Sequence, residues 1–186
     1  MTTTEQITTG QAITDQATTD QAALTGEHRE FLEALGQHRH FLRFTVQGLT
    51  DEQAALTPTA SQLCLGGLIK HVTRAEQGWY DFALGGAEAH SGQDLEVHLS
   101  TFRMAPGETL AGLLADYEAV AARTDELVSS GVDLGKSWPL PEAPWFPPNT
   151  SWSIRRVLMH IIAETAQHAG HADIIRETID GQKSMG

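Results

Sequence analysis

The sequence is poor in cysteine, in basic residues and in long apolar runs. Its single cysteine excludes an internal disulfide and a cysteine-rich zinc module. Lys and Arg number 12 against 24 Asp and Glu, a formal net charge of -12 at pH 7 that repels nucleic acid and anionic lipid. No apolar run approaches the roughly 20 residues of a membrane span, and no basic stretch precedes an apolar one near the start. These absences predict a cytoplasmic protein that binds neither nucleic acid nor membrane.

The first 25 residues differ in composition from the rest of the chain. They are rich in Thr, Gln and Ala and contain no basic residue. Such a segment buries too little apolar surface to offset the entropy lost on ordering. We therefore predict a disordered or loosely attached tail over residues 1–25 and one domain over residues 26–186, which is long enough for an ordinary core.

Helical periodicity dominates the predicted domain. Apolar residues recur at steps of three and four, which predicts helices near residues 27–48, 61–84, 108–130 and 152–179. The connections at 86–107 and 131–151 lack this period, and the second holds five of the seven prolines, which excludes a helix or a central strand. No segment alternates apolar and polar residues. The sequence therefore predicts an all-α fold, a four-helix bundle with long crossover loops.

Ionisable residues gather on the last predicted helix. A seam at alternating steps of three and four runs through Ile154, Val157, Ile161, Glu164, His168, His171 and Ile175. Such a seam faces the core of a bundle, and His160 falls within about 80° of the same arc. Burying one ionisable group costs on the order of several kcal/mol unless it is paired or binds a metal. Three such groups in succession indicate a shared partner.

A metal ion is the partner that the spacing favours. Residues four apart on one helix can bind one ion, and the pairs Glu164/His168 and His160/Glu164 have this spacing. A further ligand is needed, for which His71 on the second predicted helix is the candidate. Nitrogen and carboxylate donors with an open position are typical of catalytic zinc, and nickel and iron accept the same donors. The alternatives are a hydrogen-bonded network without metal and a stripe that faces a solvated groove.

Other residues have no comparable context. We predict a buried Cys64, Trp79 and Tyr117, and we expect the aromatic side chains of the proline-rich loop, Trp138, Trp145 and Phe146, to lie near the metal end. The remaining histidines are predicted at the surface: His28, His38, His40, His90 and His98.

Two segments of the sequence resemble a known family. The second predicted helix contains LGGLIKHVTRAEQGWYDFALGG, which is similar to the His-bearing helix of the DinB/YfiT-like superfamily. The last contains RRVLMHIIAETAQHAGHADIIRETIDG, which resembles the C-terminal segment of the DUF664-type branch. The resemblance spans residues 27–181 and implies a four-helix bundle that binds one divalent metal.

The resemblance also implies roles for the ionisable residues. Carried over by position, the metal ligands are His71, Glu164 and His168. Much of the superfamily has histidine where this chain has Glu164, whereas the related mycothiol-dependent maleylpyruvate isomerase has the same His, Glu, His set. His160 and His171 would then lie beside the ligands and act on substrate or on a proton.

The function implied by the resemblance is thiol transfer or isomerisation with a low-molecular-weight thiol such as mycothiol. A metal-bound thiol is a thiolate at neutral pH, which can attack an electrophilic carbon of a small-molecule substrate. Arg74, Arg155 and Arg156 are the candidates for binding the polar groups of the thiol. The alternatives are a metal-dependent hydrolase, for which Glu76 is the only spare carboxylate near His71, and a non-catalytic metal-binding protein. The resemblance also allows a homodimer.

Removal of residues 1–22 tests the predicted tail. We expect the melting temperature and the metal content to stay nearly unchanged, because this segment has almost no apolar surface to contribute. Calorimetric melting of the full and shortened chains checks this. A large drop would mean that the tail packs on the bundle or on a partner chain.

Overall fold

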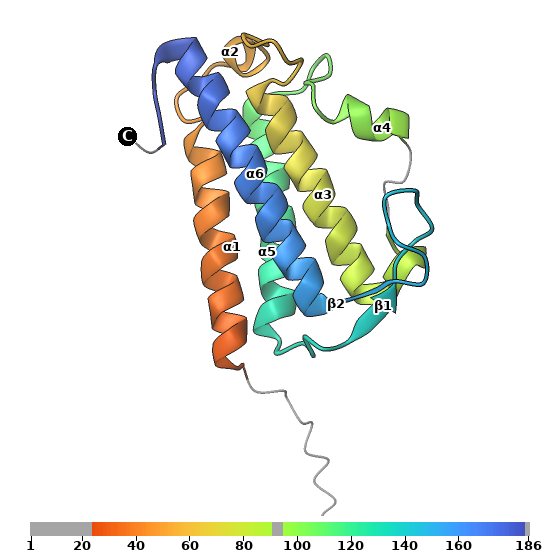
Figure 1. The fold of residues 1–186 in the computed structure, drawn as a ribbon. Coiled ribbons are helices and arrows are strands. Elements are labelled where there is room, and N and C mark those ends of the chain that lie inside the picture. The colour runs from red at the N-terminus through yellow and green to blue at the C-terminus, as the bar shows by residue number, and fades with distance from the viewer. Residues whose placement is uncertain (1–23, 91–94, 185–186) are drawn as a thin grey trace, which may run out of the picture.

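The structure is a computed structural model that describes residues 24–90 and 95–184. Within these residues four long helices lie side by side (Figure 1): α1 (Gly26–Phe44), α3 (Leu65–Gly85), α5 (Leu110–Ser129) and α6 (Ile154–Asp180). Helix α6 packs against α1 and α3, and α5 packs against the same two helices. The predicted all-α four-helix bundle is confirmed, and no helix in the described ranges has the length and apolar character needed to cross a membrane. Most of the predicted tail, residues 1–23, lies outside the described residues.

A capping interaction fixes the start of α1. The side chain of Thr25 accepts a hydrogen bond from the backbone of His28, and the His28 Nδ1 lies 2.7 Å from the Thr25 hydroxyl. The other ring nitrogen of His28 lies 2.9 Å from the carbonyl oxygen of Val132. His28 is therefore buried, and the prediction of a surface position is wrong, because Nε2 ties α1 to the loop after α5 while Nδ1 contacts the N-cap residue of α1.

The other histidines outside the cluster differ in exposure. His40 is exposed as predicted, and His38 is half-buried. The surface prediction is wrong for His90, whose half-buried ring packs on Trp79 at 4.9 Å between centroids. The side chain of His98 lies outside the described residues.

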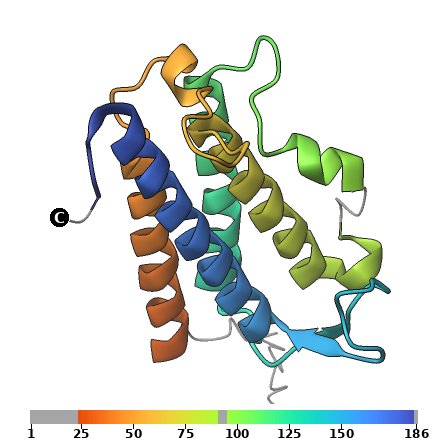
Figure 2. The same ribbon diagram turned by 45° about the horizontal axis from the view of Figure 1, so that its top comes forward.

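Short helical elements occupy the connections. Helix α2 (Asp51–Ala54) follows α1, and η1 (Gly86–Glu88) and α4 (Leu95–Ser100) lie in the segment that has no helical period. Figure 2 shows α4 and the chain that follows it beside α3. This connection brings residues 101–104 against the first turns of α3.

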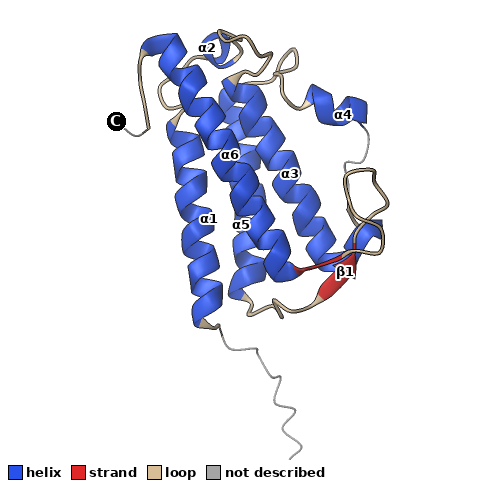
Figure 3. Cartoon of the chain, viewed as in Figure 1, coloured by secondary structure: helices blue, strands red, loops and turns tan. Residues whose placement is uncertain are grey.

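The proline-rich connection forms a two-stranded antiparallel ribbon at the start of α6 (Figure 3). Strand β1 (Ser137–Pro139) pairs with β2 (Ser151–Ser153), and Trp138 lies opposite Trp152. The expectation of no strand is wrong here. Each strand has one neighbour in this sheet, so its other edge is open. Pro139 has no N–H to donate, and none is needed on the open edge.

Two apolar clusters fill the bundle. One lies toward the end of α1 and includes Leu42, Leu68, Val72, Tyr117 and Ile175. The other lies toward the start of α1 and includes Leu35, Trp79, Phe82, Val157 and Ile161. The predicted burial of Cys64, Trp79 and Tyr117 is confirmed.

A buried ion pair lies between the two apolar clusters. Arg39 of α1 donates hydrogen bonds to both carboxylate oxygens of Glu76 on α3, and a third to Asp125 of α5 at 2.7 Å. Arg39 is 2% exposed and Glu76 is 1% exposed. Burial alone lowers the pKa of Arg39, but the two carboxylates together raise it above its ordinary value, so the guanidinium stays charged. Together with Asp125, the pair joins three of the four long helices.

Breaking this pair should strongly destabilise the bundle. In the Arg39→Met variant the Glu76 carboxylate stays buried without its partner, which costs about 3–5 kcal/mol. The Arg39→Met/Glu76→Leu double variant should lose less, because neither charge remains. Denaturant unfolding measures both, with Glu27→Gln as control, since Glu27 forms an exposed pair with Arg155. An Arg39→Met variant as stable as the control would contradict the prediction.

Candidate metal centre

Helices α3 and α6 bring three sequence-predicted ligands together. One donor atom from each of His71, Glu164 and His168 lies within 4.8 Å of the others. The rings of His71 and His168 meet edge to face, with 4.6 Å between centroids. Both histidines are buried, whereas Glu164 is half-buried. Residues almost a hundred positions apart in sequence therefore form one donor cluster between two neighbouring helices.

The cluster lies at the edge of the core rather than along its seam. The buried face of α6 passes through Ile161, Thr165, His168, Ala172 and Ile175. The predicted seam is wrong at Glu164 and His171, which are both half-buried. A straight helix drifts by about 20° per heptad from a strict 3.5-residue repeat. The buried face therefore passes through Thr165 and Ala172, each one residue after the predicted position. As a result the cluster has protein on one side and solvent on the other.

His71 is held by the chain that follows α4. Its Nδ1 lies 3.0 Å from the hydroxyl oxygen of Thr101, which is buried. The ring of Phe102 stacks on the His71 ring, with 4.0 Å between centroids and 21° between planes. Sequence reasoning missed Thr101 and Phe102, because they lie in a connection without helical period and match no ligand spacing.

Two further histidines lie beside the cluster on α6. The Nε2 of His160 is 3.5 Å from one oxygen of Glu164, and the Nε2 of His168 is 3.5 Å from the other. The Nδ1 of His171 is 3.4 Å from the Nδ1 of His168. The predicted catalytic candidates His160 and His171 thus flank the predicted ligands, one on each side.

The charges of these groups suit a cation. The hydrogen bond with His168 lowers the pKa of Glu164 below its ordinary value despite burial, so Glu164 is a carboxylate at neutral pH. Burial lowers the pKa of His160, which keeps its imidazole neutral at pH 7. A carboxylate and two imidazoles are donors that zinc and similar divalent metals accept. The residues therefore fit a metal ion.

An aromatic group lies beside His160. Its ring meets Trp79 at 4.9 Å and Trp152 at 5.1 Å, and these two indoles stack on each other at 4.8 Å. Phe146 of the proline-rich loop contacts Trp152 at 5.7 Å. The loop therefore reaches the neighbourhood of the cluster through Phe146.

The other two loop aromatics differ in position. The Trp138 indole donates a hydrogen bond to the carbonyl of Ala83 at 3.0 Å, twelve residues beyond His71 and about 18 Å along α3. Trp145 lies beside Phe146, with 6.2 Å between ring centroids, and is 65% exposed. The expectation that Trp138 lies near the metal end is wrong, because the β-ribbon anchors it at the far end of α3.

The three predicted arginines have different surroundings. Arg156 is exposed on the side of α6 that bears His160, with its guanidinium 4.5 Å from the Trp152 ring centroid. Arg155 forms an ion pair with Glu27 on α1, on the opposite side of α6. Arg74 is exposed one turn beyond His71. Arg156 is thus placed beside the aromatic group, and Arg155 is directed away from the cluster.

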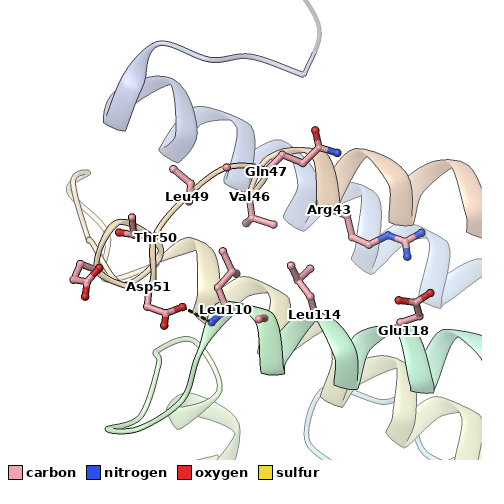
Figure 4. Close-up of a pocket in the computed structure, with 12 residues that line it drawn as sticks. Arg43, Val46, Gln47, Leu49, Thr50, Asp51, Leu110, Leu114 and Glu118 are labelled. Atoms are coloured by element: carbon pink, nitrogen blue, oxygen red, sulfur yellow. Dashed lines mark hydrogen bonds between the residues drawn. The ribbon is translucent and has the colours of Figure 1, made fainter.

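A cavity of about 720 Å³ lies at another place, between the end of α1 and the start of α5 (Figure 4). Val46, Leu49 and Leu114 line it together with Arg43. The side chain of Asp51 closes one end by accepting a hydrogen bond from the backbone of Leu110 at 2.7 Å (Figure 4). None of the three candidate ligands lines this cavity, so the donor cluster and not the cavity marks the candidate site.

The fold and the cluster define a class, a four-helix bundle with two histidines and one glutamate gathered between neighbouring helices. The family model of mycothiol S-transferase matches residues 30–181, so the chain belongs to this family. The match confirms the resemblance to the DinB/YfiT-like superfamily that the sequence indicated. A comparison with curated proteins finds no match.

Removal of a ligand should abolish tight metal binding. We expect His168→Ala and His71→Ala to lower zinc affinity by more than the roughly 10- to 100-fold typical of neighbouring partners. Glu164→Gln keeps the shape of the side chain, so it should weaken binding less than Glu164→Ala. Chelator competition measures the affinities, on protein purified without a nickel column.

The flanking histidines supply the comparison for these ligand variants. His160→Ala and His171→Ala should retain zinc with a loss of about 10- to 100-fold at most. His40→Ala, on the exposed face of α1, should bind zinc like the wild type. Zinc at 100 times its Kd should also stabilise the wild type by about 2.7 kcal/mol. A wild type without bound metal or zinc-dependent melting would leave a metal-free polar network as the explanation of the cluster.

Proposed function

We propose that this chain transfers a low-molecular-weight thiol, with mycothiol as the candidate, to an electrophilic carbon of a small-molecule substrate. A divalent metal held by His71, Glu164 and His168 would take part, with zinc first and nickel or iron next. The observation that carries the proposal is the meeting of these three donor groups within 4.8 Å in a member of the mycothiol S-transferase family.

The ligand environment supports a catalytic rather than a structural role for the metal. The Thr101 hydroxyl lies at the Nδ1 of His71, so the His71 imidazole would bind the metal through Nε2. Glu164 is half-buried, which leaves one side of the cluster accessible to a thiol. A divalent cation held there supplies the positive charge that favours a thiolate over a thiol at neutral pH.

The chain's own residues would handle the proton and the substrate. The thiol proton passes to an imidazole, for which His160 and His171 are the candidates. The sulfur then forms a bond to the electrophilic carbon, and the leaving group departs with its bonding electron pair. Trp152 and Arg156 beside His160 offer an aromatic face and a guanidinium to the thiol or the electrophile.

Hydrolysis has less support. That reaction needs a general base near the metal, and the spare carboxylate that the sequence offered is Glu76. Both of its oxygens accept hydrogen bonds from Arg39, so Glu76 faces α1 and not His71.

A conjugation assay tests the proposal. Zinc-loaded protein is incubated with an aryl halide, such as chlorodinitrobenzene, and with mycothiol, cysteine or glutathione. Mass spectrometry then measures the thioether formed. We expect a conjugate that needs zinc and is formed fastest with mycothiol. Glu164→Ala should lose it, while His40→Ala should keep it.

The flanking histidines separate catalysis from binding in the same assay. His160→Ala or His171→Ala should lower the rate by about 100-fold or more if the residue transfers the proton, with metal content unchanged. Protein that binds zinc and conjugates none of the three thiols to activated electrophiles would overturn the proposal and leave a metal-binding protein.

A further inference from the structure

The chain after α4 approaches α3 closely at two consecutive glycines. A Cβ atom on Gly67 would lie 2.0 Å from the carbonyl oxygen of Phe102, and one on Gly66 would lie 2.3 Å from the sulfur of Met104. The first contact is with backbone, so a side chain at Gly67 would displace the whole segment. Glycine inside a helix costs about 1 kcal/mol relative to alanine. Here it allows residues 101–104 to lie directly on the helix.

This close approach delivers two side chains to a candidate metal ligand. His71 lies four residues after Gly67, and therefore one turn further along the same face of α3. Over this face the buried hydroxyl of Thr101 lies 3.0 Å from the His71 Nδ1, and the Phe102 ring covers the imidazole. The backbone of the segment is also held, since the Cys64 thiol donates a weak hydrogen bond to the Phe102 carbonyl at 3.7 Å.

We infer that Thr101 is a positioning residue that sets the tautomer of His71, and that the absence of a side chain at Gly67 allows Thr101 to reach His71. The Thr101 oxygen accepts a hydrogen bond from Nδ1–H of His71, which places the lone pair on Nε2, on the side of Glu164 and His168. Histidines that bind metals generally donate their second ring N–H to such a partner, and its loss typically costs about 10- to 100-fold in affinity. The inference rests on the proposed metal-dependent function.

The tautomer can be measured without metal. Nitrogen-15 NMR of the metal-free protein, at mildly alkaline pH where imidazoles are neutral, distinguishes the two ring nitrogens. The His71 signals are identified by their absence in His71→Gln. We expect protonated Nδ1 in the wild type, loss of this preference in Thr101→Val, and its recovery in Thr101→Ser. The matched control is Thr124→Val, because Thr124 is equally buried on α5 and bonds to backbone there.

Zinc affinity gives a second readout. Chelator competition should show a loss of about 10- to 100-fold for Thr101→Val, near-complete recovery for Thr101→Ser and no change for Thr124→Val. Gly67→Ala should also lose the tautomer preference although Thr101 is intact. Its control is Gly36→Ala, where an added Cβ meets no atom within 4 Å.

The outcomes separate the inference from the proposed function. If Thr101→Val keeps both the wild-type tautomer and the wild-type zinc affinity, Thr101 has no positioning role, whatever the fate of Gly67→Ala. If the wild type binds no zinc, the proposed function fails, and the tautomer in the metal-free protein still decides whether Thr101 orients His71.

Discussion

The buried ion pair between Arg39 and Glu76 is the interaction on which the arrangement of the helices depends. It favours one displacement of α3 along α1, because another displacement would leave a buried charge without its partner. Arg176 does the same for α6, since it donates hydrogen bonds to the carbonyls of Thr45 and Gln47 at the end of α1 at 2.9 and 2.8 Å. An arginine thus sets the position along α1 of each helix that carries the donor cluster. The meeting of the donors follows from these two registers.

The two sides of the donor cluster have different properties. On the side of α3, the chain after α4 surrounds His71 with the Thr101 hydroxyl and the Phe102 ring, which fixes the orientation of the imidazole. On the side of α6, Glu164 is half-buried and charged. The His71 side of the cluster is therefore held by its neighbours and the Glu164 side is accessible, as the proposed metal binding and thiol transfer require. Membership in the mycothiol S-transferase family agrees with the proposed thiol transfer.

Helical periodicity was sufficient to predict the bundle, because four amphipathic segments must bury their apolar faces against one another. It failed where the strict heptad drifts from the geometry of a straight helix, at Glu164 and His171, and where a partner lies in a distant loop, as for His28. The spacing of Glu164 and His168 on one helix was visible in the sequence. His71 was their candidate companion because a metal needs a further ligand, and the family resemblance assigned it by position, whereas contacts between helices leave no local pattern that would confirm the choice.

The sequence by itself determined the class of fold, the gathering of ionisable residues on the last helix and the family to which the chain belongs. These follow from local periodicity and from residue identity, which can be read from the sequence without knowing which residues are neighbours in space. Only the tertiary structure decided that the cluster lies at the edge of the core, that Glu76 belongs to Arg39, and that Thr101 reaches His71. Each of these depends on segments far apart in the chain, and their juxtaposition is set by packing, by the buried arginines and by the absence of a side chain at Gly67.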